Sequence, residues 1–137
     1  MRVWPALCAG VLVCAFAGEV TAAETLTGKL VIVSGQAPAL EVKGRATVRL
    51  DGDETMRQIL GDTRLNGLEV EAKGTMASPG RFYLEPYHMT PLLVRQNGKL
   101  KRITYWCETC HIRAYVPGPC VCCYEETELD LIDPDTN

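Results

Sequence analysis

The sequence has 137 residues, with 17 acidic and 14 basic side chains and a formal net charge of −3. This length fits one domain and excludes a large two-lobed enzyme. A hydrophobic fraction of 47% is enough for a buried core, which excludes a wholly disordered chain. The acidic balance argues against nucleic acid as a partner, because phosphate binding favours a strongly basic surface.

The first 23 residues have the layout of a secretory signal peptide. Arg2 precedes an uncharged, largely apolar segment, residues 3–18, and small-residue patterns then predict cleavage near Ala22 or Ala23. The segment is shorter than the ~20 apolar residues of a typical membrane span. We therefore expect a periplasmic or secreted protein with no membrane span after cleavage; an uncleaved anchor is the alternative.

Cleavage would remove two of the seven cysteines and leave five, all between Cys107 and Cys123. Outside the cytosol, cysteine thiols are expected to be paired in disulfides, bound to metal or attached to a cofactor. This region is therefore where we expect the chemistry of the protein to lie.

The part that follows the signal peptide is predicted to be a β-rich body. Leu26–Val33 is apolar and rich in β-branched residues, which predicts a strand. Leu40–Leu50 alternates apolar even positions with mostly charged odd positions, which predicts one strand with a buried face and a wet face. Gly44 interrupts this alternation and predicts a bulge or a sharp coil within that strand.

A short helix is predicted next, over residues 54–60. Asp53 supplies an N-cap side chain and Gly61 ends the helix. Alternation then returns in Leu68–Ala72, a predicted strand that ends at Gly74.

The body closes with a further strand and a hairpin. Arg81–Glu85 is the predicted strand, and Pro91–Arg95 pairs with Leu100–Trp106 around the Asn97-Gly98 turn. Asn-Gly between apolar strands is a strong hairpin signal. Short strands with one small helix indicate a mainly β fold.

Two stretches of this body, GLEVEAKG (67–74) and GRFYL (80–84), resemble an OB-fold domain, and the resemblance covers residues 25–95. It implies a small Greek-key barrel, a fold that often binds oligonucleotides or oligosaccharides. The acidic balance disfavours that activity here, and a fold does not by itself determine a function.

Two Cys-x-x-Cys pairs follow, Cys107 with Cys110 and Cys120 with Cys123, separated by nine residues. The short spacing lets one tight turn direct two sulfurs at a single point. Two such turns, joined by a predicted strand over Ile112–Val116, supply the four ligands of a tetrahedral structural site.

This tail resembles a zinc ribbon, and CVCCYEETEL (120–129) is similar to the second knuckle of rubredoxin-type ribbons. The resemblance implies a structural zinc ion on the same four cysteines. Ribbons often have glycine after each second cysteine, where this chain has His111 and Tyr124. Cys122 is the spare thiol, which either replaces a neighbouring ligand or stays weakly reactive.

We accordingly divide the chain into a signal peptide (1–23), an OB-like barrel (24–96), a cysteine-rich zinc-ribbon-type hairpin (97–130) and an acidic tail (131–137). The whole layout resembles small secreted bacterial proteins that end in YWCxxC and PGxCxCC. The acidic end of the chain either pairs with the basic side chains of the preceding hairpin, binds cations weakly or keeps the tail soluble.

The first cysteine pair also forms Cys-x-x-Cys-His, the attachment motif of c-type cytochromes. That resemblance implies haem on Cys107 and Cys110, with His111 as the proximal iron ligand and Met89 or His88 as the sixth ligand. Such a protein is an electron carrier. Two observations oppose it: the motif follows a predicted strand where cytochromes present a helix, and three further cysteines would have no role.

Other arrangements of the five cysteines stay open. Two disulfides with one leftover thiol would suit an exported protein, and Cys120, Cys122 and Cys123 offer soft ligands for Cu(I). Two histidines provide no convincing Ser-His-Asp set, so we expect no enzymatic activity. We expect binding or assembly with a protein partner in the cell envelope, such as a membrane complex.

Overall fold

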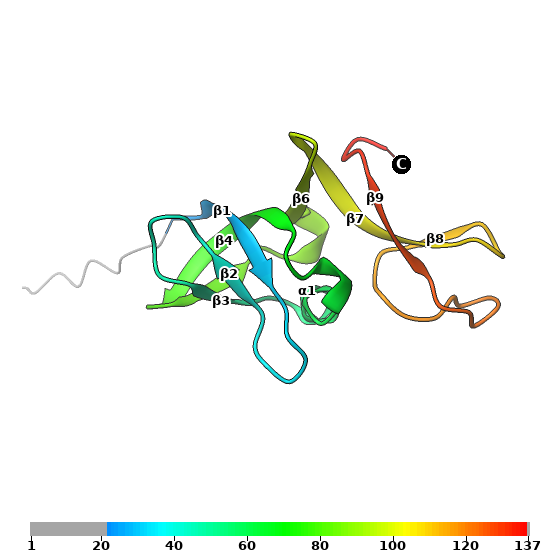
Figure 1. Cartoon of the computed structure of the whole chain (residues 1–137), viewed down its shortest axis with the longest axis horizontal. Coiled ribbons are helices and arrows are strands. Elements are labelled where there is room, and N and C mark those ends of the chain that lie inside the picture. Colours follow the sequence, from blue (N-terminus) through cyan, green and yellow to red (C-terminus); the bar gives the residue numbers. More distant parts are fainter. Residues whose placement is uncertain (1–21, 137) are drawn as a thin grey trace, which may run out of the picture.

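The structure, a computed structural model, describes residues 22–136, so nearly all of the predicted signal peptide lies outside the described residues. The described chain forms nine strands, one α-helix and two short 3₁₀ helices (Figure 1): β1 (Glu24–Val31), β2 (Ala39–Glu41), β3 (Val48–Asp51), α1 (Glu54–Leu60), η1 (Thr63–Leu65), β4 (Glu69–Ser78), β5 (Arg81–Leu84), η2 (Tyr87–Met89), β6 (Leu92–Gln96), β7 (Lys99–Cys107), β8 (Ile112–Ala114) and β9 (Glu128–Ile132). Within residues 22–136, no helix has the length and apolar character needed to cross a membrane.

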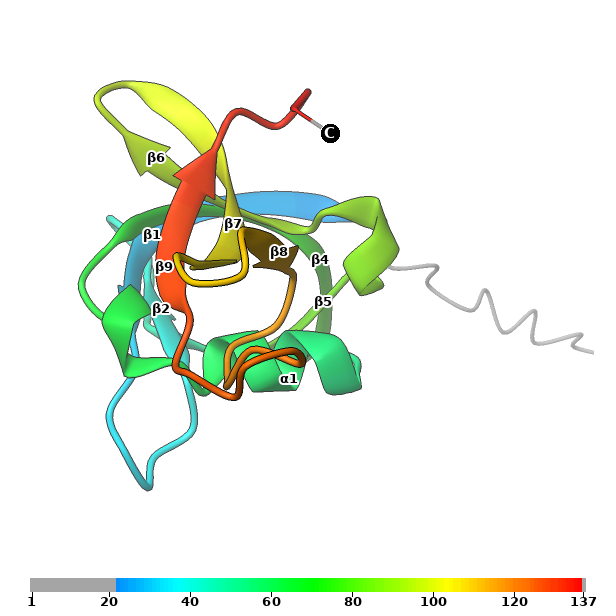
Figure 2. The ribbon, with the colours of Figure 1, turned by 90° about the vertical axis from the view of Figure 1, so that its right-hand side faces the viewer.

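The first five strands close into a barrel, which Figure 2 shows nearly end-on. Its strands follow one another in the order β1, β2, β3, β5 and β4, and β4 pairs back onto β1. All neighbours are antiparallel except β3 and β5, which run parallel. The predicted mainly β fold with a small barrel is therefore confirmed.

The C-terminal strands continue from the barrel through β6, which pairs with β4. Strand β7 then pairs with β6 over its first half and with β8 over its second half. Strand β9 covers the other edge of β7. The three-stranded unit β8–β7–β9 lies at the far end of the molecule and carries the cysteines (Figure 1).

One hydrophobic core joins both parts. It contains the apolar side chains of the barrel strands and the inner face of α1, and it extends into β7 through Ile103 and Tyr105. Leu129 and Leu131 of β9 pack against it. Because β7 contributes to the core and also ends at Cys107, the cysteine region is held to the barrel by a continuous strand.

The segment 40–50 differs from its predicted form. Instead of one bulged strand, it forms two strands, β2 and β3, with a turn between them in which Gly44 has φ +74°. Leu40 pairs with Val48, so residues of the same parity face each other. The alternation of apolar and polar positions therefore continues on both sides of the turn. Because one long strand and a hairpin of two short strands give the same alternation, the pattern does not distinguish them.

Strand β4 is longer than the prediction, which ended it at Gly74. The strand continues to Ser78, and Gly74 pairs with Leu84 of β5. A Cβ atom at Gly74 would lie 2.1 Å from the carbonyl oxygen of Tyr83. This glycine permits a close approach of two strands, whereas the prediction interpreted it as a strand end.

The predicted helix and hairpin turn are confirmed. Helix α1 spans Glu54–Leu60, and the Asp53 carboxylate accepts a hydrogen bond from the backbone N–H of Met56. Asn97 and Gly98 form the turn between β6 and β7, with φ values of 50° and 76°. Positive φ at both positions matches the backbone that Asn-Gly favours in a two-residue hairpin.

Candidate metal centre

The first cysteine turn is built on the hairpin of β7 and β8. Cys107 is the last residue of β7 and pairs with Ile112, the first residue of β8. Within the turn, the N–H of His111 donates to the carbonyl of Cys107 at 2.9 Å. The N–H of Cys110 donates to the Cys107 sulfur at 3.4 Å. The backbone therefore fixes where both sulfurs of this pair lie.

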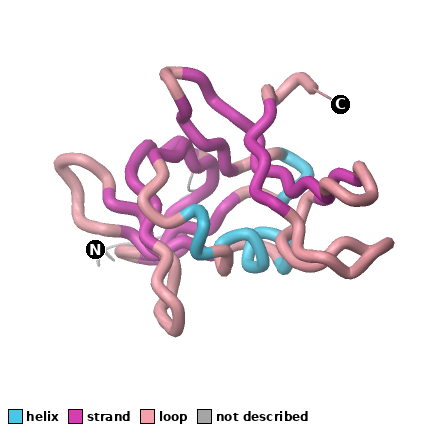
Figure 3. Tube along the Cα trace, turned by 45° about the vertical axis from the view of Figure 1, so that its right-hand side comes forward, coloured by secondary structure: helices cyan, strands magenta, loops and turns pink. Residues whose placement is uncertain are grey.

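The second cysteine turn lies in the loop between β8 and β9 and shares the bond to the carbonyl of its first cysteine, while the bond to the sulfur comes from one position earlier. The N–H of Tyr124 donates to the carbonyl of Cys120 at 2.9 Å, and the N–H of Cys122 donates to the Cys120 sulfur at 3.4 Å. A bridge between Pro119 and Glu126 closes the turn from behind. The two turns project in the same direction from the end of the molecule (Figures 1 and 3).

The four cysteines of the two pairs converge on one point. The Sγ atoms of Cys107, Cys110, Cys120 and Cys123 all lie within 4.8 Å of one another, and those of Cys107 and Cys123 are 3.5 Å apart. Four sulfurs placed about 2.3 Å from a tetrahedral zinc ion lie roughly 3.8 Å from each other. A disulfide needs about 2.05 Å, and the cysteines here are free. The geometry therefore fits a metal ion.

The residue after each second cysteine has the left-handed backbone for which ribbons often use glycine. His111 has φ +54° and Tyr124 has φ +62°. The His111 ring stacks on Trp106, with centroids 5.9 Å apart and an interplanar angle of 10°. The turn geometry is thus kept at both positions without glycine, and at His111 the stacking compensates for the strain.

Burial and hydrogen bonding make the four sulfurs unequal. Cys107 and Cys120 are buried, while Cys110 and Cys123 are half-buried. Hydrogen bonds from the backbone N–H groups of Cys123 and Cys122 lower the pKa of Cys120 to about 7. The neighbouring thiols of Cys122 and Cys123 raise the pKa of Cys110. Crowded sulfurs resist full ionisation without a cation, and a bound metal ion reverses that preference.

Side chains around the two turns hold them together. Thr109 of the first turn donates to the carboxylate of Glu125, next to the second turn, at 2.5 Å. On β8, Arg113 donates to Asp130 of β9 at 2.6 Å and to Thr104 of β7 at 2.7 Å. The three strands are therefore connected at the base of the cluster.

Arg64, which follows α1, fixes the cysteine loop to the barrel. Its guanidinium pairs with Asp62 at 2.9 Å and donates to the carbonyl of Thr127 at 2.8 Å. It also lies over the ring of Tyr105, 5.3 Å from the centroid. Nothing in the sequence pattern indicated this role for Arg64, because Thr127 and Tyr105 are 63 and 41 residues away along the chain.

The haem alternative requires different positions for the same side chains. Cys107 and Cys110 lie in the four-sulfur cluster, and the His111 ring is stacked on Trp106. Met89, the predicted sixth ligand, lies in η2 with an exposed side chain. The described arrangement brings together the four cysteines predicted as metal ligands, and it leaves Met89 in a segment between barrel strand β5 and β6.

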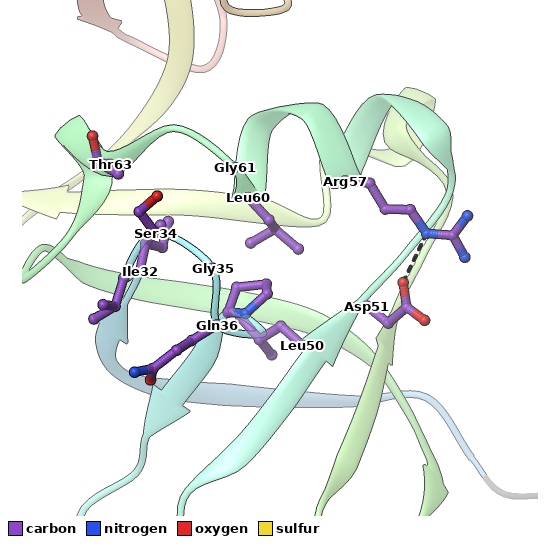
Figure 4. A pocket seen from close by; sticks show the side chains of 12 residues that line it. Ile32, Ser34, Gly35, Gln36, Leu50, Asp51, Arg57, Leu60, Gly61 and Thr63 are labelled. Carbon is purple, nitrogen blue, oxygen red and sulfur yellow. Dashed lines mark hydrogen bonds and ion pairs between the residues drawn. The ribbon is translucent and has the colours of Figure 1, made fainter.

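A hollow of about 270 Å³ lies at the side of the barrel, between the loop after β1 and helix α1. Ile32, Leu50 and Leu60 form its apolar wall, and the ion pair between Arg57 and Asp51 lies beside it (Figure 4). Both charged groups are already paired, at 3.0 Å, so the hollow presents no unpaired charge to a ligand.

No protein-family model, curated protein or solved structure matches this chain.

Proposed function

We propose that the protein is an exported, non-catalytic binding or assembly protein whose C-terminal unit folds around one structural zinc ion. The observation that carries this proposal is the convergence of four cysteine sulfurs from two turns, in each of which a backbone N–H donates to the sulfur of the first cysteine. When bound, zinc would cross-link the two turns through Cys107, Cys110, Cys120 and Cys123. Four thiolates close its coordination shell and leave no open position for catalysis.

The C-terminal cysteine unit needs a metal because it buries few apolar side chains of its own. Val121 and Tyr124 of the second turn are exposed, and the segment between β8 and β9 is almost entirely loop (Figure 3). Small units without a sufficient core are commonly stabilised by disulfides or a metal. Here the thiols are positioned for a metal, which supports a zinc-ribbon-type hairpin.

Other features support the remaining parts of the proposal. The closed five-strand order, with α1 between β3 and β4, is consistent with an OB-like barrel. The signal-like N-terminus supports export to the periplasm or beyond. The exposed side chains of Val121 and Tyr124 offer apolar contact area for a protein partner in the cell envelope.

The test begins with the purified protein exported by a bacterial host that has a working haem-attachment system. We expect a colourless protein with about one zinc ion per chain, and a chelator should unfold residues 108–126 as measured by amide hydrogen exchange. A Soret band with covalent haem would contradict the zinc site and indicate an electron carrier. A protein with neither group would contradict both.

Two matched variants separate these outcomes. Cys120→Ser should abolish zinc binding, because this buried sulfur is one of the four ligands. His111→Ala should keep the zinc, because its ring stacks on Trp106 and is outside the sulfur cluster. A haem protein would show the opposite pattern, since haem attachment needs His111 and does not use Cys120.

A further inference from the structure

Strand β9 is an edge strand. Strand β7 has β6 and β8 along one side and β9 along the other, as Figure 2 shows for β9, β7 and β8. Among the strands of residues 22–136, β9 pairs with β7 alone. The segment Glu128–Ile132 therefore presents one side that no strand covers. An uncovered edge offers its N–H and C=O groups to an added strand.

The free backbone groups of this edge belong to Leu129 and Leu131. Along a strand, peptide groups face the two edges in alternation. The carbonyl of Cys107 accepts a hydrogen bond inside the β7–β8 hairpin, so odd-numbered residues of β7 face β8 and even-numbered ones face β9. Their partners in β9 are also even-numbered. The N–H and C=O groups of Leu129 and Leu131 therefore point away from β7.

The barrel limits how far this edge is open. The carbonyl of Thr127, just before β9, accepts a hydrogen bond from Arg64 at 2.8 Å. The side chains of Leu129 and Leu131 pack against the core but are only half-buried. An added strand would therefore begin beyond Thr127, and its inner side chains would shield the two leucines further from water.

A hollow of about 250 Å³ lies beside β9, on the face of the sheet that carries Trp106. Arg113 in its wall pairs with Asp130 at 2.6 Å. Within the described residues, no cation pairs with Glu108 or Glu128, and both side chains are exposed. The hollow therefore keeps an excess of negative charge next to the open edge. It is lined by Trp106, Glu108, Arg113, Glu128, Leu129 and Asp130.

We propose that β9 binds an extended segment of a partner protein by strand addition, with a basic side chain of that segment in the hollow. The added backbone pairs with the N–H and C=O groups of Leu129 and Leu131. Because side chains alternate across a strand, its apolar residues lie beside the two leucines and its basic residues lie beside Glu128 and Asp130. This inference deepens the proposed function and rests on its binding to a protein partner.

The charge of the C-terminal segment favours a basic partner over a second copy of this chain. Residues 125–137 contain six acidic side chains and no basic one. Two β9 strands paired edge to edge would bring like charges together, which is unfavourable. A segment with basic side chains is instead complementary in charge, and such complementarity gives specificity and faster association.

The probe for this edge is a capped seven-residue peptide of alternating valine and arginine, added to the exported, zinc-loaded protein. It should bind, and at saturation the amide hydrogen exchange of Leu129 and Leu131 should slow by about tenfold or more. Exchange at Asp130, whose N–H already faces β7, should change less. The matching valine–glutamate peptide should not bind. No binding at about 1 mM valine–arginine peptide, or binding that leaves both leucine amides unprotected, would overturn the proposal.

A pair of charge-reversal variants tests the hollow. Glu128→Lys should weaken binding of the valine–arginine peptide about tenfold. Asp135→Lys makes the same change of charge at an exposed residue outside both β9 and the hollow, and it should weaken binding less than about twofold. Glu128→Gln removes the charge alone and should lose about threefold, which provides a second test if the reversal disturbs the fold. Equal losses at the two positions would indicate general attraction to an acidic protein and would refute the basic subsite.

Two further measurements on the same samples separate this inference from the others. Sedimentation of the protein alone should show a monomer, and a dimer that protects the amides of Leu129 and Leu131 would identify a second copy as the occupant and overturn the assignment. Zinc analysis reports on the metal site independently. A protein that holds zinc but binds no peptide refutes strand addition only, whereas a protein without zinc contradicts the proposed structural site.

Discussion

Tyr124 has a left-handed backbone, with φ +62°, while its side chain is 80% exposed. Left-handed φ strains any residue with a Cβ atom, and an exposed ring gains little packing in return. His111 occupies the equivalent position of the first turn, but its ring stacks on Trp106. The two turns therefore differ in how well the strain is compensated.

Replacing Tyr124 with glycine should stabilise the zinc-loaded protein by about 0.5 kcal/mol, the net of relieved strain and the extra flexibility of unfolded glycine. Urea denaturation at a fixed zinc concentration measures this difference. His111→Gly is the control and should gain less or lose stability, because it removes the stacked ring. Equal gains at both positions would show that the stacking on Trp106 contributes nothing.

Asp51 should make the stability of the protein depend on pH, because its carboxyl pKa is lowered in the folded state. Hydrogen bonds from Arg57, from the N–H of Gly52 and from Arg81 lower its pKa from 3.8 to about 2. A carboxylate with a lowered folded pKa contributes stability that is complete above its unfolded pKa and is lost as pH falls toward the folded value. The stabilisation should therefore disappear between pH 4 and pH 2.

Across that window, the free energy of unfolding should fall about 1 kcal/mol further in the unsubstituted protein than in Asp51→Asn, after allowance for solvent screening of these partly exposed pairs. Thermal denaturation at a series of pH values provides the measurement. Asp133→Asn serves as the comparison: Lys101 also lowers the pKa of this carboxyl, but the side chain is more exposed, so its loss should change the pH profile less. The same pH profile for unsubstituted protein and Asp51→Asn would contradict the assignment.

At the scale of the elements, the close packing of β4 on β5 depends on Gly74. An alanine Cβ there would meet the carbonyl oxygen of Tyr83 at 2.1 Å, so the strands would have to separate. Gly74→Ala should lower the free energy of unfolding by about 2 kcal/mol. Chemical denaturation measures the loss.

Gly80→Ala is the matched control, because a Cβ at Gly80 meets nothing within 4 Å and only its positive φ is strained. That variant should lose about 1 kcal/mol. A smaller loss at Gly74 than at Gly80 would mean that the strand contact does not limit this position.

Local signals predicted the elements whose causes are local. The cap at Asp53 and the Asn97-Gly98 turn depend on neighbouring residues, and both are confirmed. The end of β4 and the separation of β2 from β3 depend on which strand lies alongside, which alternation along one segment does not encode. The predictions were wrong at those two places for this reason.

At the candidate site too, the local motifs were predictable from the sequence and the pairing of distant segments was not. Two Cys-x-x-Cys turns were visible in the sequence because each is a local motif, and the structure brings their sulfurs together. The acidic C-terminal segment was interpreted only by its charge, although Glu128–Ile132 forms β9 and Leu129 and Leu131 pack on the core. One of its possible roles is confirmed, since Asp133 pairs with Lys101 at 2.6 Å.

At the scale of the whole molecule, Arg64 connects the barrel to the cysteine loop through Asp62 and the carbonyl of Thr127. Lysine keeps the charge but cannot reproduce two directed guanidinium bonds. Arg64→Lys should therefore destabilise the protein by about 1.5 kcal/mol. Amide hydrogen exchange should become faster in residues 119–127 while the barrel amides stay protected.

Arg57→Lys is the control for this connection, because Arg57 pairs with Asp51 on the barrel itself. It should leave exchange in residues 119–127 unchanged. If both variants accelerate exchange there equally, the loop is loosened by general destabilisation and Arg64 is not a specific tie.

Strand β7 belongs to both the barrel and the cysteine unit, and this limits how the chain can be divided in protein engineering. Its first half pairs with β6, its second half with β8, and Ile103 and Tyr105 between them enter the common core. A cut that grafts the cysteine unit onto another scaffold would expose those two side chains, and the donor barrel would lose part of its interior. The cysteine unit therefore cannot be moved to another protein on its own. Any chimera has to include β6 and the strand β4 with which β6 pairs.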